Sequence, residues 1–252
     1  MLDRLAHEFV DSGWNVKHVL KLIALSRAYR QESVASTRHF TGQSRLRLPA
    51  EFIRDNALSI SGLLVNEVGG PSIRPYQPAG YYKYLNFPKR DYAADKDSKQ
   101  WRRGVYVHWQ RQYLHPMLKA FDAPRREECT AARPRSNTPL AALALLNDPT
   151  FVEAARAFAA RILKEGGDKD ESRIVFAFRL ATSRTPDEAE QSVLLGLLAD
   201  ARRDFSQDEA AAAKLLAVGI TPKSGNVPPR ELAAWTTVTR ALLNLSETTT
   251  RN

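Results

Sequence analysis

Residues 138–162, TPLAALALLNDPTFVEAARAFAARI, contain two helix starts in succession. Thr138 precedes Pro139, and Asp148 precedes Pro149. In each pair, a side chain suited to cap a helix stands before a proline suited to the first helical position. Apolar residues then recur every three or four positions, as on the buried face of a helix. They are Leu140, Leu143 and Leu146 after the first cap, and Phe151, Ala155, Phe158 and Ile162 after the second.

Similar helical patterns lie on both sides of this stretch. Towards the C-terminus, Thr185-Pro186-Asp187-Glu188 is typical of a capping box. Towards the N-terminus, Asn15 can cap one helix and Pro49 can open another. The apolar positions of these helices are Leu2, Leu5, Ala6 and Phe9; Val16, Val19, Leu20 and Ile23; Ile53, Ala57, Ile60 and Leu64; Ile174, Val175 and Phe178; Leu194, Leu198, Ala201 and Phe205; and Trp235, Val238, Leu242 and Leu245.

The middle of the chain lacks a helical period. Residues 66–100 are rich in glycine, proline and tyrosine, and residues 114–137 are irregular. Between them, residues 103–110 alternate apolar and polar side chains, which predicts a short strand. We therefore expect a mainly α fold with little β-strand. Helical groups at 1–65 and 138–252 would enclose a loop-rich central segment at 66–137, and the three parts would fold together.

Composition is typical of a folded chain, with 43% hydrophobic and 26% charged residues. The net charge is +9, and the excess lies in residues 1–49 and 99–165, so we expect a basic face if these segments meet. Cys129 is the single cysteine, which excludes internal disulfides, paired-cysteine zinc sites and a haem-attachment motif. We expect no bound metal and no cofactor in this chain.

Targeting and membrane signals are also lacking in the sequence. No run of about 18 apolar residues occurs, so we expect no membrane span. The first residues lack the charged and apolar regions of a signal peptide and begin as if within a helix. We therefore expect the chain to be a piece of a longer protein.

Several longer motifs occur along nearly the whole chain. They are Phe9-Val10-Asp11-Ser12-Gly13-Trp14, Gly69-Gly70-Pro71-Ser72, Phe121-Asp122-Ala123-Pro124, Arg126-Glu127-Glu128-Cys129-Thr130, Ser136-Asn137-Thr138-Pro139-Leu140, Leu145-Leu146-Asn147-Asp148-Pro149 and Leu243-Asn244-Leu245-Ser246-Glu247-Thr248. In sequence and in order these motifs resemble a planctomycete-type domain of unknown function, number 1553, the PSD family.

The resemblance implies the C-terminal region of large exported bacterial proteins, located in the periplasm or at the cell surface. Upstream domains of such proteins include a c-type cytochrome-like domain, so a c-type haem is expected there and not in this chain. The resemblance implies partners among those upstream domains or other surface proteins, and no established activity. This chain departs from the family pattern at Ser36–Leu46, which is too short for a stretch that relatives carry.

The first candidate site is the segment 121–138. Its arginines precede a helix start whose free N–H groups could receive an anion, and guanidinium groups match carboxylate or phosphate. Alternatively, its carboxylates occupy those arginines in a structural network. The candidate residues are Asp122, Arg125, Arg126, Glu127, Arg133, Arg135, Asn137 and Thr138.

Three further candidates carry weaker patterns. Residues 101–111 interleave basic and aromatic side chains, which could contact nucleic acid or form a half-buried strand, but no nucleic-acid motif accompanies them. The tyrosine-rich loop at 76–92, with Asp91 and Asp95, could bind or hydrolyse a sugar, or could pack over the core. Cys129 with His108 or His115 could form a nucleophile and base, or Cys129 could be a small buried residue.

These observations favour a non-catalytic binding or assembly module of a larger exported, cytochrome-linked protein, with 99–138 as its contact surface. One alternative is a hydrolase of an acidic or sulfated polysaccharide that uses Asp122, Glu127 and the arginines. Another is polyanion or nucleic-acid binding, which predicts affinity that falls steeply with salt. Nucleic acid is the least favoured partner.

Overall fold

The computed structural model describes residues 1–31, 45–83, 91–110, 113–125, 127, 129–222 and 227–251. Within these residues the fold is mainly α, as predicted, and the strands β1 (Leu46–Arg47) and β2 (Thr250–Arg251) form a two-stranded antiparallel sheet. The chain divides into two compact units. The smaller is Met1–Arg47 with the last residues from Thr250, and the larger is Leu48–Thr249. The division at 1–65, 66–137 and 138–252 stays a prediction from sequence pattern.

The smaller unit contains two short helices, α1 (Leu2–Asp11) and α2 (Val16–Leu25). As predicted, Asn15 caps α2, and its side chain accepts a hydrogen bond from the N–H of His18 at 3.1 Å. The chain turns between the helices through Gly13 and Trp14, both of which have positive φ. Neither helix buries a single residue, although the apolar side chains recur as on a core-facing helix.

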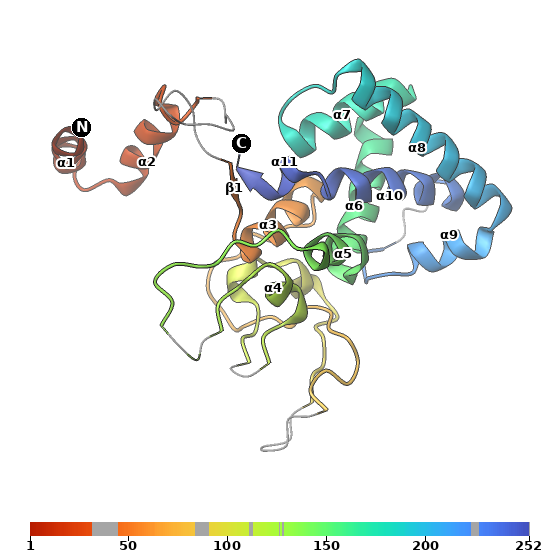
Figure 1. The fold of residues 1–252 in the computed structure, drawn as a ribbon, viewed down its shortest axis with the longest axis horizontal. Helices are drawn as coiled ribbons and strands as arrows, with labels where there is room; N and C mark the ends of the chain where they lie inside the picture. Colours follow the sequence, from red (N-terminus) through yellow and green to blue (C-terminus); the bar gives the residue numbers. More distant parts are fainter. Residues whose placement is uncertain are drawn as a thin grey trace. The chain divides into compact units, whose positions relative to one another are not determined.

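The larger unit is built around two helices, α6 (Pro149–Glu165) and α10 (Pro229–Leu243), which cross at its centre (Figure 1). Around them pack α3 (Ala50–Ser61), α5 (Pro139–Asn147), α7 (Asp170–Thr182), α8 (Glu188–Gln207), α9 (Glu209–Leu216) and the short α11 (Ser246–Thr249). The core between them includes the fully buried Phe151, Phe158 and Trp235. The predicted apolar positions of α6, which include these two phenylalanines, are buried. On α5 the prediction is wrong, because Leu140 and Leu143 are exposed and Ala141 and Leu145 are buried instead.

Both predicted caps in that stretch are confirmed. The Thr138 hydroxyl accepts from the N–H of Ala141 at 3.3 Å, and the Asp148 carboxylate accepts from the N–H of Thr150 at 2.9 Å. The capping box at the start of α8 lies two residues beyond the predicted Thr185. Asp187 caps the helix, and the Glu190 carboxylate accepts a hydrogen bond from the N–H of Asp187.

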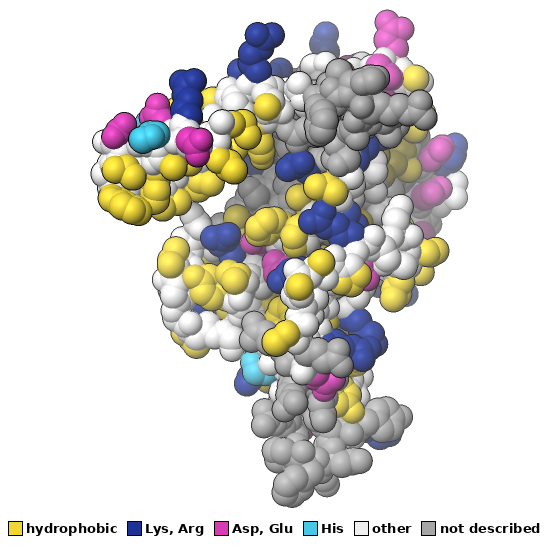
Figure 2. All heavy atoms as spheres, turned by 60° about the vertical axis from the view of Figure 1, so that its left-hand side comes forward, with side chains coloured by type: hydrophobic (Ala, Val, Ile, Leu, Met, Phe, Trp, Pro, Cys, Tyr) yellow, Lys and Arg dark blue, Asp and Glu magenta, His cyan; other side chains and the backbone are white. Residues whose placement is uncertain are grey.

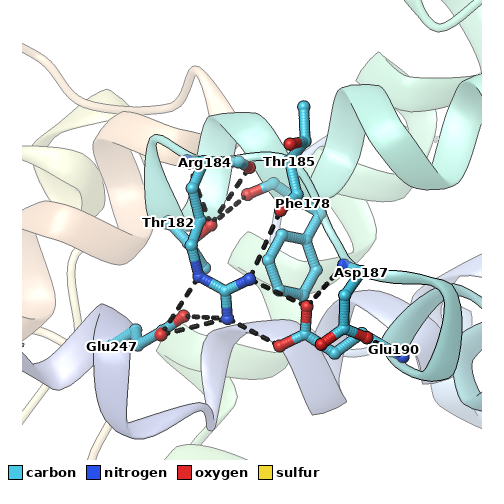
Figure 3. Close-up of polar contacts among 7 residues, drawn as sticks. All are labelled: Phe178, Thr182, Arg184, Thr185, Asp187, Glu190 and Glu247. Carbon is cyan, nitrogen blue, oxygen red and sulfur yellow. Dashed lines mark hydrogen bonds and ion pairs between the residues drawn. The ribbon is translucent and has the colours of Figure 1, made fainter.

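Arg184 holds the loop before α8 against α11. Its guanidinium binds the carboxylates of Glu190 and Glu247 and lies over the ring of Phe178, 4.7 Å from the centroid (Figure 3). The three partners come from α7, α8 and α11. Arg184 thus links these three helices through two ion pairs and one contact with an aromatic ring.

The central segment differs from the prediction in two places. Where a strand was expected at 103–110, the chain forms a 3₁₀ turn at Gly104–Tyr106, preceded by another at Ser98–Trp101. Gly104 passes so close to α3 that an added Cβ would lie 2.8 Å from the Cα of Glu51, and Val107 pairs with Ile73 only as an isolated bridge. Val105 is consequently exposed while Val107 is buried. Residues 114–137 are also not wholly irregular, since α4 (Pro116–Ala120) begins at a proline there.

Two buried arginines fix this segment to the helices. Arg54 of α3 donates to the carbonyl oxygens of Gln100 and Arg102. Arg102 in turn donates to the carbonyls of Pro71, Glu67 and Gly69 and lies over the ring of Tyr106, 4.3 Å from its centroid. Long loops with buried backbone need such donors, and here guanidinium groups supply them.

Candidate functional site

A cavity of about 420 Å³ lies beside α4, within the segment that the sequence singles out. Its floor comes from α4, which starts at Pro116 because proline suits the first helical position. Just after α4, Asp122 adopts a left-handed conformation with φ of 57° and turns the chain back across the helix end. The cavity is lined by Leu114, Lys119, Asp122, Ala123, Pro124, Arg125, Glu127, Thr130 and Pro134.

Asp122 fastens the two ends of the loop that forms the cavity wall. Its carboxylate accepts hydrogen bonds from the backbone N–H of Ser136 at 2.7 Å and from the Ser136 hydroxyl at 2.8 and 2.9 Å. A charged acceptor with several donors is a strong local tie. Asp122 is therefore engaged in holding the loop and is poorly placed to act as a free acid or base.

The cationic side chains of the cavity are Lys119 and Arg125. Both are exposed, and within the described part of the chain neither has an ion-pair partner. Arg125 is close enough to Tyr81 to act on its hydroxyl electrostatically, although burial dominates and raises the pKa of Tyr81. Glu127 lines the same cavity and is exposed. The cavity is open, its lining is partly apolar, and it combines the positive charges of Lys119 and Arg125 with the carboxylates of Asp122 and Glu127.

The remaining predicted site residues do not join this cavity. Arg133 leaves it and binds both carboxylate oxygens of Glu51 on α3, at 2.8 and 3.1 Å. Thr138 is used as the cap of α5, while Arg135 and Asn137 are exposed. Arg126 lies outside the described residues. Six lining residues were not among the predicted site residues: Leu114, Lys119, Ala123, Pro124, Thr130 and Pro134.

Several of the basic and aromatic residues at 101–111 contact other parts of the protein. Arg102 is buried and holds backbone carbonyls, so it cannot contact phosphate from outside. Arg103 lies 3.6 Å from the carboxylate of Asp55, and the Trp101 indole donates to Glu153 at 3.2 Å. The half-buried strand with solvated arginines is wrong, because the chain forms a 3₁₀ turn here and Arg102 is buried. The Arg103 side chain is 42% exposed, and contact with nucleic acid stays a prediction. Arg111 lies outside the described residues.

The tyrosines of the 76–92 loop pack on one another. Tyr81, Tyr82, Tyr92 and Tyr113 make edge or tilted ring contacts with centroids 5.4 to 6.1 Å apart. The Tyr92 hydroxyl donates to the carbonyl of Pro75, and burial raises its pKa. These described rings form a packed cluster. Residues 84–90 lie outside the described chain.

Asp95, the second carboxylate proposed for that loop, is used locally. Its side chain accepts a hydrogen bond from the N–H of Arg74 at 2.7 Å. Asp91 is exposed. The contacts around the tyrosines and Asp95 thus resemble those of a loop packed over the core.

Cys129 is exposed, so it is not the small buried residue that the sequence allowed. His115 is buried, its Nε2 lies 2.8 Å from the carbonyl oxygen of Tyr76, and burial lowers its pKa to about 4. His108 lies 3.4 Å from the hydroxyl of Ser72. Among the described residues no cluster of histidine, cysteine, aspartate and glutamate has the arrangement of a metal site.

A buried carboxylate that the sequence did not reveal lies on α6. Glu153 accepts hydrogen bonds from Tyr76, Trp101, Ile220 and Thr221, and Arg156 lies 3.9 Å away. Glu153 is 1% exposed. It joins three distant segments and offers no access to a ligand, so its role is structural.

The larger unit is a mainly helical module, and in its described part a loop-built cavity beside α4 brings together two cationic side chains, Lys119 and Arg125, and two carboxylates, Asp122 and Glu127. A family model matches residues 1–198, and the chain therefore belongs to the family described as PSD1, protein of unknown function (DUF1553). Neither a curated protein nor a solved structure matches it. In the described part of the chain, no helix combines the length and apolar character that a bilayer crossing requires.

Proposed function

We propose that this chain is a non-catalytic binding and assembly module, and that it receives an acidic group of a protein partner in the cavity beside α4. One observation carries the proposal. Lys119 and Arg125 line an open cavity and have no ion-pair partner among the described residues, while Asp122 is occupied with Ser136.

The cavity suits a carboxylate side chain presented by a folded surface. Arg125 can offer two parallel N–H donors to one carboxylate, and Lys119 adds a point charge. Leu114, Pro124 and Pro134 provide apolar walls for the carbon stem of the same side chain. Charges of this kind at a contact surface contribute orientation and association rate as well as affinity.

The wider setting follows from the family resemblance. We propose that the module serves a larger exported, cytochrome-linked protein, located in the periplasm or at the cell surface. Upstream domains of that protein, or another surface protein, would present the acidic group. Any c-type haem would belong to those domains and not to this chain.

A second candidate, a hydrolase of acidic or sulfated polysaccharide, is favoured by one feature: Asp122 and Glu127 both line the cavity. The bonds from Ser136 to Asp122 weigh against it, because a carboxylate that holds a loop is not free to exchange protons. A general polyanion or nucleic-acid site has less support, since Arg102 and Arg103 contact backbone carbonyls and Asp55.

The test measures binding to the upstream region of a longer family member, at low and high salt. Lys119→Ala with Arg125→Ala should weaken binding about tenfold or more, since a lost tenfold corresponds to about 1.4 kcal/mol. The matched control, Arg179→Ala with Lys214→Ala, removes the same charge from exposed positions on α7 and α9 and should leave affinity within about twofold.

Three outcomes would overturn the proposal. They are absence of binding by the wild-type chain at low salt, equal loss in both double variants, and release of reducing ends from a sulfated polysaccharide such as dextran sulfate. The last result would support the hydrolase. Equal loss in both variants would indicate a general charge effect.

A further inference from the structure

The α1–α2 hairpin exposes an extended apolar face. Figure 2 shows hydrophobic side chains gathered on one face of this hairpin, with charged side chains along another. Leu2 is 78% exposed and Trp14 68% exposed, although such side chains are normally at least partly covered. The other large exposed apolar residues of this region are Met1, Val10, Val16, Leu20, Leu22, Ile23, Leu25 and Tyr29.

Such a hairpin needs a covering surface. Each helix has ten residues, and isolated helices of this length are marginal in water. Amphipathic helices gain most of their stability when the apolar face packs against another element. Contiguous exposed apolar patches on folded proteins mark interaction sites.

The apolar face of the hairpin also contains a groove. A groove of about 530 Å³ runs between the start of α1 and the end of α2. Apolar side chains dominate its lining, and Arg4, Glu8 and Ser26 are its polar members. Trp14 lies in the turn with φ of 61°, held against Phe9 by an edge contact with ring centroids 5.1 Å apart. The hairpin thus carries both a hollow and a projecting aromatic side chain.

The net charges of α1 and α2 favour a second copy of this chain as the partner that covers the apolar face. Helix α1 contains three acidic residues, Asp3, Glu8 and Asp11, and one basic residue, Arg4, so it carries a net charge of −2. On α2, Lys17 and Lys21 are unopposed by any acidic residue, which gives +2 when His18 is neutral. A two-fold axis brings the same patch of two copies together. The two helices are therefore complementary to each other across such an axis, and like helices would repel.

We propose that the α1–α2 hairpin is a self-association surface, on which α1 of one copy packs against α2 of a second copy. Two equivalent contacts form, each pairing an acidic helix with a basic one. The apolar faces are buried between the copies. This surface is independent of the cavity beside α4, so either can fail without the other.

Charge-reversed variants of the full chain test both the association and its geometry. Variant A carries Lys17→Glu and Lys21→Glu; variant B carries Asp3→Lys and Asp11→Lys. Glu8 is left unchanged because His18 Nε2 lies 3.2 Å from it. Sedimentation equilibrium over the micromolar range should give a dimer for the wild-type chain and weaker self-association, about tenfold or more, for A alone and B alone. An equimolar mixture of A and B should restore the dimer, because both contacts are again between opposite charges.

Two controls keep the outcome interpretable. Circular dichroism reports whether A and B retain the wild-type helix content, and Val193→Ser removes an exposed apolar side chain from α8 without affecting association. A monomeric wild-type chain throughout the range would overturn the proposal, whether the hairpin is then covered by the larger unit or by another protein. A dimer that persists in A and B separately, or fails to return in their mixture, would overturn the α1-to-α2 pairing.

Discussion

The carboxylate of Glu153 on α6 accepts a hydrogen bond of 2.9 Å from the hydroxyl of Tyr76, 77 positions earlier in the chain. The same carboxylate accepts from the Trp101 indole and from the backbone N–H groups of Ile220 and Thr221. Burial and the charge of Glu153 both raise the pKa of Tyr76, so its hydroxyl stays protonated and donates. One buried acceptor thus joins the central segment to the loop before α10.

Glu153→Ala should therefore be strongly destabilising. It leaves several buried donors without an acceptor, and removing one member of a buried charged network costs about 3–5 kcal/mol. Urea unfolding followed by circular dichroism measures the loss. The matched control is Glu165→Ala at the exposed end of α6, where Glu165 pairs with Arg161 at 3.0 Å and should contribute less than about 1 kcal/mol. Similar losses in the two variants would contradict the assigned role of Glu153.

Substitution by alanine should have opposite effects on stability at two glycines, Gly104 and Gly196. Gly104→Ala places a Cβ 2.8 Å from both the Cα and the carbonyl oxygen of Glu51, so α3 and the 3₁₀ turn must separate. We expect a loss of about 1–3 kcal/mol, as for an overpacked site. Gly196→Ala lies on α8 with no heavy atom within 4 Å of the new Cβ, and should stabilise the protein by about 0.5–1 kcal/mol. Thermal unfolding of both variants checks the signs, and a neutral Gly104→Ala would show that the approach is not close.

Local signals in the sequence predicted the starts of helices α2, α5 and α6 well, because the caps act on residues two or three positions away. Asn15, Thr138 and Asp148 each bond within their own first turn, as their positions indicate. The central segment was predicted poorly for the opposite reason. Its conformation depends on partners tens of residues away, such as the contact of Gly104 with Glu51, which no local alternation of side chains reveals.

The candidate site could be predicted only in part, because composition marks a segment but not the contacts of its side chains. Composition marked the arginine-rich segment 121–138, and most of the residues that line the cavity lie in it, while Leu114 and Lys119 precede it. Which of its arginines reach the cavity was not predictable, because Arg133 is diverted to Glu51 on a helix 82 positions earlier. Lys119 joins the site only because Asp122 turns the chain back over α4.

Lowering the pH should weaken the ion pair between Arg184 and Glu190. Hydrogen bonds from Arg184 lower the pKa of Glu190 from 4.5 to about 2. A carboxyl group whose pKa is lower in the folded state stabilises the fold above its unfolded pKa, and this contribution disappears as pH falls from 4.5 to about 2. Glu190→Gln should thus be less stable than the wild-type chain at neutral pH, by less than about 1 kcal/mol because the pair is partly exposed. The two curves of unfolding free energy against pH should converge near pH 2; parallel curves would refute the assignment.

Substitution of Asp122 separates binding from catalysis in the cavity. Asp122→Asn keeps a side chain that tolerates the left-handed conformation and retains one acceptor oxygen for Ser136. It also removes a negative charge beside Lys119 and Arg125, so an acidic partner should bind at least as tightly as before. A hydrolase that needed this carboxylate would instead lose turnover while binding substrate.

Affinity for the acidic partner and release of reducing ends, measured on the same preparation, give the two readouts. Resistance to limited proteolysis at residues 123–135 serves as the control that the loop is still held. If the loop remains protected and affinity falls about tenfold, the carboxylate contacts the ligand and the proposed role of Asp122 as a loop fastener is wrong.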